Sequence, residues 1–232
     1  MEPAGGFAYA AAVVLPPAVK GQPPRPATGR LYKIDTDKGE VAGTPISHPE
    51  PLDGLRIAPF GRTLVTAETL VGPPRPGKQY NLLTVDAVTW KKAKLIPIPA
   101  PAKDLTFTAE GILALAAVDA KTLVFGYSDG AAETADVTPK DIPLDGFSYL
   151  RVTPDGKRAV AVAGMKQNGL LLMTVAGAGD RAKFVKVTSG STVAGAAVGG
   201  HFILTPDSKY AVFNCGAVVD LEKTTAPPKG KD

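Results

Sequence analysis

Short apolar runs alternate with polar corners along the whole chain, and one combination of the two recurs. The clearest copy spans 149–163, where an apolar run meets Thr-Pro-Asp-Gly-Lys and a second apolar run follows. Looser copies span 54–66, 104–115 and 201–213. Proline presets φ for a tight turn, aspartate caps the turn through its side chain, and glycine accepts positive φ. Each copy therefore predicts a β-hairpin whose strands flank the corner.

The copies recur with a period of 45 to 56 residues, measured between the corner positions Pro3, Pro59, Ala109, Pro154 and Pro206. A second element, an apolar run that ends in aspartate, follows within the period at Asp35, Asp86 and Asp220, and more loosely at Asp129. A period of this length holds about four strands of typical size. We therefore expect one four-stranded antiparallel sheet per period.

This period divides the chain into five repeats, the first and last of them incomplete. The expected repeats are about 1–50, 51–101, 102–143, 144–192 and 193–223, followed by a polar disordered tail at 224–232. The first repeat lacks the inner strand that precedes the corner elsewhere, which suggests that an upstream segment is missing from this chain. The last repeat ends near Leu221. A five-bladed ring and the C-terminal part of a seven-bladed one both fit this pattern.

One sheet of this kind cannot bury both of its faces, whereas several sheets stacked radially can. The corners at Thr153–Lys157 and Thr205–Lys209, together with the segment Leu31–Gly39, resemble the WD40-like, YVTN and TolB-type repeats of bacterial β-propellers. The resemblance implies an all-β β-propeller of about five blade-like units. The Trp-Asp dipeptide of true WD40 repeats is absent, and the motifs specify a fold rather than an activity.

Composition narrows the function classes. The net charge is +4, but lysine and arginine are scattered and do not alternate with aromatic residues, so no nucleic-acid partner is predicted. No apolar run reaches the length of a transmembrane helix. The one cysteine, Cys215, excludes an internal disulfide and is expected to be buried on a strand. An extracytoplasmic location is favoured over a cytoplasmic one, because bacterial propellers that the chain resembles are often exported.

Two proline-rich loops depart from the repeat, at 16–29 and 72–79. In the expected blade, loops after the second strand and loops before the inner strand emerge on one face. Stiff proline-rich segments lose little entropy on docking, which suits recognition of a protein partner. The candidate partner-binding residues on this face are Lys20, Arg25, Asp53, Arg75, Lys78 and Asp145. The alternative is that the prolines only stiffen exposed loops.

No catalytic residue, metal ligand or cofactor site is predicted. His48 and His201 are far apart in sequence, His48 in an expected loop and His201 at the start of an inner strand. The corner residues Asp155 and Asp207 are interpreted as turn caps. No serine nucleophile motif or phosphate-binding loop occurs.

The favoured interpretation is a non-catalytic scaffold that binds a protein partner within a larger bacterial assembly. Fold-level resemblance also leaves open a propeller enzyme, such as a lactonase or a quinoprotein dehydrogenase subunit. A third possibility is a purely structural subunit whose incomplete first and last blades are covered by neighbouring subunits.

Overall fold

The computed structural model describes residues 6–18, 20–22, 25–58, 62–71, 77–108, 111–118, 121–128, 131–136, 147–163, 170–175, 184–190 and 201–223. The chain forms two compact units, Met1–Ala102 and Lys103–Asp232. All regular elements of the described residues are β-strands. Within these ranges no helix has the length and apolar character that a membrane crossing requires.

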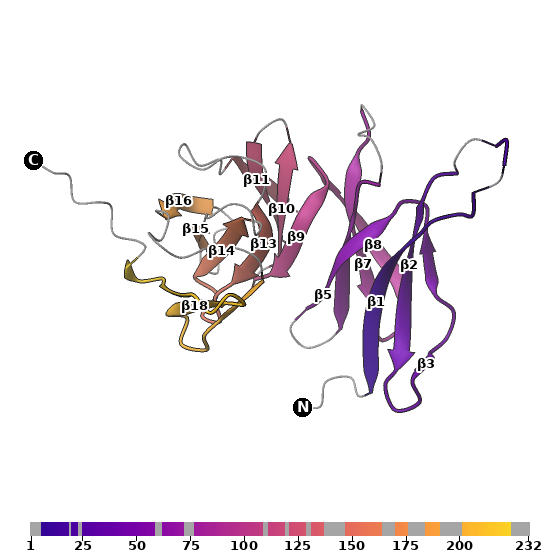
Figure 1. Ribbon diagram of the computed structural model, residues 1–232, viewed down its shortest axis with the longest axis horizontal. Coiled ribbons are helices and arrows are strands. Elements are labelled where there is room, and N and C mark those ends of the chain that lie inside the picture. The colour runs from indigo at the N-terminus through magenta and orange to yellow at the C-terminus, as the bar shows by residue number, and fades with distance from the viewer. Residues whose placement is uncertain are drawn as a thin grey trace, which may run out of the picture. The chain divides into compact units, whose positions relative to one another are not determined.

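The first unit contains two antiparallel sheets (Figure 1). Sheet A consists of β1 (Phe7–Val14), β2 (Thr28–Asp35), β3 (Glu40–Val41) and β4 (Ile46–His48). Sheet B consists of β5 (Leu52–Ile57), β6 (Thr63–Glu68), β7 (Tyr80–Asp86) and β8 (Lys91–Ile98). In sheet B each strand pairs with the next one along the chain, which is the predicted four-stranded unit.

The other three sheets lie in the second unit, which begins at the second residue of β9. Sheet C consists of β9 (Ala102–Phe107), β10 (Ile112–Val118), β11 (Lys121–Ser128) and β12 (Ala131–Asp136). Sheet D consists of β13 (Phe147–Val152), β14 (Arg158–Ala163), β15 (Leu170–Val175) and β16 (Phe184–Gly190). Sheet E consists of β17 (Phe202–Leu204), β18 (Tyr210–Phe213) and β19 (Val218–Asp220).

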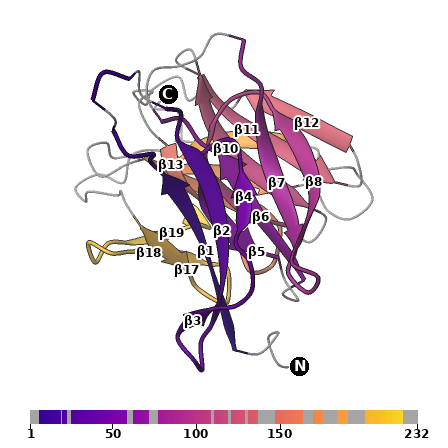
Figure 2. The ribbon, with the colours of Figure 1, turned by 90° about the vertical axis from the view of Figure 1, so that its right-hand side faces the viewer.

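Sheet A differs from sheet B at both of its edges. Strand β1 follows the first corner and therefore corresponds to β6, the second strand of sheet B. Figure 2 shows β1 and β2 side by side, and they pair along their full length from Phe7↔Asp35 to Val14↔Thr28. The short strands β3 and β4 both pair with β2, in the place that β8 takes beside β7. No described strand takes the inner position, as the sequence predicts.

A shared apolar core joins sheets A and B. Its buried members are Leu31, Leu52, Leu64, Leu83, Val85 and Ala87. Trp90, in the turn after β7, packs on this core and stacks on Tyr9 with ring centroids 5.9 Å apart. The Trp90 indole N–H donates to the Thr44 carbonyl at 2.9 Å. Burial of each leucine contributes about 2 kcal/mol, so this core stabilises the face-to-face packing of the two sheets.

A second core lies between sheets D and E. Its buried members are Val160, Val162, Leu170, Leu172, Phe202, Ala211, Phe213, Val219 and Leu221. The rings of Phe202 and Phe213 stack 5.5 Å apart across β17 and β18. Both described cores lie between the faces of successive sheets, which explains why the apolar runs are continuous rather than strictly alternating.

The repeated corners have the turn chemistry that the sequence predicts. The Asp155 carboxylate accepts hydrogen bonds from the Thr153 hydroxyl at 2.5 Å and the Lys157 amide at 3.0 Å. Gly156 follows with a φ of 71°. The corner of sheet E repeats these bonds around Asp207, with Ser208 at a φ of 62° where the other corner has glycine. Both aspartates therefore act as turn caps.

Acid should remove the contribution of the Asp155 carboxylate to the stability of the fold. Burial raises the pKa of this carboxyl, but the Thr153 and Lys157 hydrogen bonds and the nearby Arg158 charge outweigh it, so the pKa is below the ordinary 3.8. A carboxyl with a depressed pKa stabilises the fold above its unfolded pKa, and the contribution disappears as pH falls through the folded value. We expect Asp155→Asn to lower Tm at pH 7 and to lower it less at pH 3. Melts of Glu40→Gln at both pH values give the surface control, and an equal Asp155→Asn deficit at both would contradict this assignment.

Candidate functional site

The two proline-rich loops begin and end at the same end of sheets A and B. Residues 15–27 connect β1 to β2, and residues 69–79 connect β6 to β7. The link from β4 to β5, residues 49–51, lies between them, because His48 pairs with Gly29 and Leu52 pairs with Glu68. We call this end of the first unit the loop end. It contains most of the described candidate residues.

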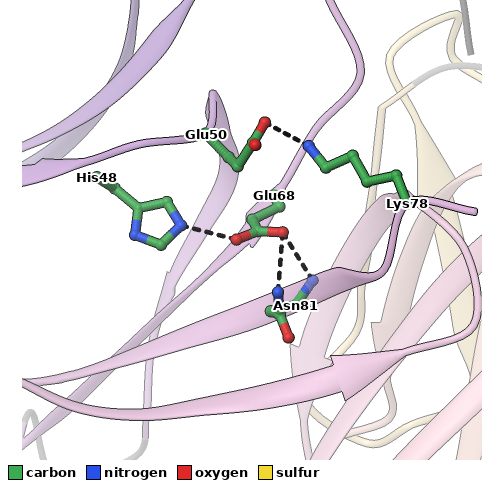
Figure 3. Close-up of polar contacts among 5 residues, drawn as sticks. All are labelled: His48, Glu50, Glu68, Lys78 and Asn81. Atoms are coloured by element: carbon green, nitrogen blue, oxygen red, sulfur yellow. Dashed lines mark hydrogen bonds and ion pairs between the residues drawn. The ribbon is translucent and has the colours of Figure 1, made fainter. Parts of the chain in front are cut away.

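A buried polar network joins the two sheets at the loop end (Figure 3). The His48 imidazole Nε2 lies 2.8 Å from Glu68 Oε1, and both side chains are less than 5% exposed. The second oxygen of Glu68 accepts hydrogen bonds from the backbone and side-chain amides of Asn81, each at 3.0 Å. Glu68 ends β6 and Asn81 begins β7, so the network closes the base of the 69–79 loop and ties it to sheet A.

The environment of Glu68 favours its ionised form. Burial raises the pKa of this carboxyl. The hydrogen bonds from His48 and Asn81 and the charge of Lys78 lower it by more than burial raises it, so the net pKa is below the ordinary 4.5. A buried carboxylate is tolerated only when its oxygens have hydrogen-bond donors. Glu68 has three of them, so the network is a structural anchor at the base of the loop.

Lys78 is held inside the loop end. Its ammonium forms an ion pair with Glu50 and lies 4.8 Å from the centre of the Tyr80 ring. The Lys78 side chain is only 14% exposed. This candidate cation therefore fastens the second proline-rich loop to the β4–β5 link, as Figure 3 shows.

Gly29 allows the link to pack closely against β2. A Cβ atom at this position would lie 2.5 Å from Leu52 Cγ and 2.6 Å from the Glu50 carbonyl oxygen. Side chains do not approach backbone atoms this closely, so only glycine fits. The Thr69 amide also donates to the Pro51 carbonyl at 2.9 Å, so the link is held from both sides.

Exposed apolar and basic side chains lie on the two loops. Leu15 is 69% exposed and directly follows β1, and Val71 is 41% exposed and lies three residues after the end of β6. Lys20 and Arg25 are exposed on the first loop. Asp53 is exposed on β5, where its carboxylate accepts a 2.7 Å hydrogen bond from the Gly54 amide. The candidates Arg75 and Asp145 lie outside the described residues.

A second polar group lies on the inner strands of the second unit. The buried Asp104 carboxylate on β9 accepts from the Leu150 amide at 2.9 Å and from the Arg151 guanidinium at 2.7 Å. Tyr149, which directly precedes Leu150 on β13, faces the exposed His201 ring, with 4.5 Å between the two ring centroids. These contacts link β9 to β13, and β13 to His201, which lies directly before β17. The sequence indicated an inner-strand position for His201 but not its pairing with Tyr149.

Two sequence-based placements are corrected. His48 is not a loop residue; it ends β4 and is buried, because Glu68 from the next sheet accepts its hydrogen bond. Cys215 is not buried on a strand; it is exposed in the turn between β18 and β19. Within the described part of the chain, no group of three His, Cys, Asp or Glu side chains is arranged to hold a metal ion.

Comparison with known proteins gives matches only among solved structures. No protein-family model and no curated protein sequence matches this chain. The periplasmic gluconolactonase PpgL of Pseudomonas aeruginosa aligns with 93% of this chain and 66% of its own, with a TM-score of 0.59 and 14% identity. The β-propeller domain of Cps50 (Swd1) from Myceliophteria thermophila aligns over 87% and 65%, with a TM-score of 0.54 and 13% identity.

A functionally unknown protein from Desulfotomaculum acetoxidans aligns over 84% of this chain and 65% of its own, with a TM-score of 0.56 and 15% identity. This chain thus spans less than two thirds of the length of each of the three. Sequence identities this low carry information on the fold alone. Successive antiparallel sheets joined in chain order, and their likeness to these propellers, show that the chain has the β-propeller fold.

Proposed function

We propose that this chain is a non-catalytic β-propeller scaffold that binds a protein partner through the loop end of sheets A and B. The observation that carries the proposal is the combination of a fixed base and an exposed surface. Leu15, Val71, Lys20 and Arg25 are exposed, while the buried contact between His48 and Glu68 holds the strands beneath them. A surface whose supporting strands are held in place before binding loses less entropy when a partner docks.

The exposed side chains indicate the chemistry of the partner. An apolar centre bordered by polar and charged residues is the usual anatomy of a protein interface, and arginine is enriched there. Lys20 and Arg25 would attract acidic residues, and this attraction weakens as salt screens it. The partner surface should therefore carry an apolar patch bordered by aspartate or glutamate.

A crosslinking experiment tests this proposal. A photoreactive amino acid is placed at position 20 in the full chain, and the crosslinked protein is identified and purified. Its affinity is then measured for a variant that combines Leu15→Ser, Lys20→Glu, Arg25→Glu and Val71→Ser. We expect the affinity to fall about a hundredfold or more, because the changes remove two apolar contacts and reverse two charges.

The matched control uses the same kinds of substitution on another part of the first unit. Leu95 is 49% exposed and Lys92 is exposed, both on β8. The variant Lys92→Glu/Leu95→Ser should keep the parent affinity. Equal affinity of the four-site variant and the parent would reject the loop end as the binding surface.

A propeller enzyme is the second candidate function. Two observations favour it: the similarity in fold to a gluconolactonase structure, and the exposed His201 beside Tyr149 on the inner strands. The discriminating assay compares hydrolysis of gluconolactone by the parent chain and by His201→Ala. A rate for the parent that does not exceed the buffer rate would reject the lactonase candidate.

A further inference from the structure

Strand β1 has one unpaired edge among the described strands. It pairs with β2 over all eight residues, and no described strand pairs on its other side. In sheets B, C, D and E that side of the corresponding strand is occupied by an inner strand, namely β5, β9, β13 and β17. Sheet A therefore offers a strand-length position that the described residues do not fill.

The hydrogen-bond pattern identifies which backbone groups face this edge. The Thr36 amide donates to the Gly6 carbonyl at 2.6 Å, which makes these two residues a hydrogen-bonded pair. Hydrogen-bonded and non-hydrogen-bonded pairs alternate along an antiparallel ladder. The amides and carbonyls of Phe7, Tyr9, Ala11 and Val13 therefore point away from β2, toward the unpaired edge.

The composition of β1 is unusual for an exposed edge. Its sequence, Phe-Ala-Tyr-Ala-Ala-Ala-Val-Val, contains no charge and no proline. Soluble proteins normally protect edge strands with charged residues, with proline or by keeping them short. The outer strand β8 follows this rule with Lys91, Lys92 and Lys94, and the inner strands β5, β9 and β13 each carry at least one charged residue. A long, neutral edge such as that of β1 is suited to pairing with another strand.

We propose that the unpaired edge of β1 binds an extended segment of a partner polypeptide as an added, antiparallel inner strand. The surface is separate from the loop-end residues that the proposed function uses. The added strand would complete sheet A on the pattern of sheet B, where β5 pairs antiparallel with β6. Its side chains would extend the core at Tyr9 and Ala11, which already pack against the apolar residues shared by sheets A and B.

The second unit indicates what the segment should contain. There, Asp104 on the inner strand of one sheet binds Arg151 on the inner strand of the next, and Arg151 also donates to the Leu150 carbonyl. Arg56 holds the position in sheet B that Arg151 holds in sheet D, and it donates likewise to the Leu55 carbonyl. A segment with an acidic residue at the position of Asp104, followed by alternating apolar residues, would place that carboxylate beside Arg56.

The chain itself supplies a suitable probe, a synthetic peptide with the sequence of residues 102–108, Ala-Lys-Asp-Leu-Thr-Phe-Thr. Amide hydrogen exchange of the full chain is followed by NMR with and without the peptide. We expect the amides of Phe7, Tyr9, Ala11 and Val13 to exchange quickly in the chain alone. Saturating peptide should slow them at least about tenfold, and it should affect the alternate amides of β1 much less, because those already bond to β2.

Two controls make the test specific. A peptide with Thr106→Pro lacks an amide that should face β1, because Thr108 and therefore Thr106 face β10 in sheet C, and it should not slow exchange. An Asp104→Asn peptide should bind the parent chain more weakly than the Asp104 peptide does. In an Arg56→Ala chain the two peptides should bind equally. Together these results would show that Arg56 is the reason for the preference for an acidic residue.

Three results would overturn the proposal. The first is no slowing by the Asp104 peptide, and the second is equal slowing by the proline peptide. The third is slow exchange of the four edge amides in the chain alone. In that case sedimentation would show whether a second copy covers β1, as a dimer, or the same chain covers it, as a monomer. None of these results bears on binding at Lys20 and Arg25.

Discussion

Replacing Gly29 with alanine is expected to lower the free energy of unfolding by about 3 kcal/mol or more. The new Cβ would lie 2.5 Å from Leu52 Cγ and 2.6 Å from the Glu50 carbonyl oxygen. The leucine is buried in the core that joins sheets A and B, and the carbonyl belongs to the backbone of the link. Neither atom is the end of a flexible side chain. The clash with the new Cβ can therefore be relieved only if β2 and the β4–β5 link move apart.

Thermal and urea unfolding of Gly29→Ala measure this effect. For a chain of this size we expect Tm to fall by about 10 °C. Gly21→Ala is the matched control, because Gly21 has no heavy atom within 4 Å of its built Cβ and has a φ of 80°. That variant should cost only the strain of a left-handed alanine, about 1–2 kcal/mol. Gly29 does not have a positive φ, so its loss measures the close contact alone, and a loss near zero would contradict this explanation.

Much of the fold could be predicted from the sequence, because its signals are local. The Thr-Pro-Asp-Gly-Lys corner forms its bonds within five residues, from Thr153 to Lys157, and the structure shows those bonds. The apolar runs on either side of this corner are the strands β13 and β14, as the repeat predicts. Repetition turns such local signals into an architecture, since each copy repeats the same hairpin.

The candidate site was less predictable, because its contacts join residues that are distant in sequence. His48 and Glu68 are 20 residues apart, and Lys78 and Glu50 are 28 apart. Neither separation corresponds to a motif, and both pairs form only because sheets A and B pack face to face. The sequence alone therefore predicts Lys78 as a partner-binding cation and His48 as a loop residue. A possible signal was the placement of Glu68 and Asn81 at the two ends of the same loop.

The packing of turns was also outside the reach of local signals. Cys215 lies in an apolar stretch of sequence, between Phe213 and Val218, which is typical of a strand. It nevertheless falls in the tight turn that ends with Gly216 at a φ of 86°. Sheet E uses short strands of three or four residues, so its turns begin earlier than the apolar pattern indicates.

Replacing Glu68 with alanine is expected to cost about 3–5 kcal/mol, because it removes one partner of a buried, charge-assisted network. The change leaves the His48 imidazole and the Asn81 amides without the acceptors that they use now. Glu68→Gln should cost less, since it retains one acceptor oxygen and the shape of the side chain. Lys78→Met should cost about 1 kcal/mol, the size typical of a partly exposed ion pair.

Chemical unfolding at two pH values measures the contribution of Glu68. The pKa of its carboxyl is below the ordinary 4.5 in the folded chain, so the stabilisation is present above pH 4.5 and is lost as pH falls through the folded pKa. The deficit of Glu68→Ala relative to the parent should therefore be largest near pH 7 and should shrink below pH 4. A deficit that stays constant with pH would show that the charge of Glu68 plays no part.

Limited trypsin digestion tests whether the network also orders the loop end. Trypsin cuts after lysine and arginine, and Lys20 is exposed on the first proline-rich loop. The contact between His48 and Glu68 ties sheet A to sheet B beneath this loop. Its loss in Glu68→Ala should therefore speed cleavage after Lys20 about tenfold. Cleavage after Lys209, in the corner of sheet E, should keep the parent rate. Equal acceleration at both sites would indicate general destabilisation, and the network would then have no special role in presenting the loops.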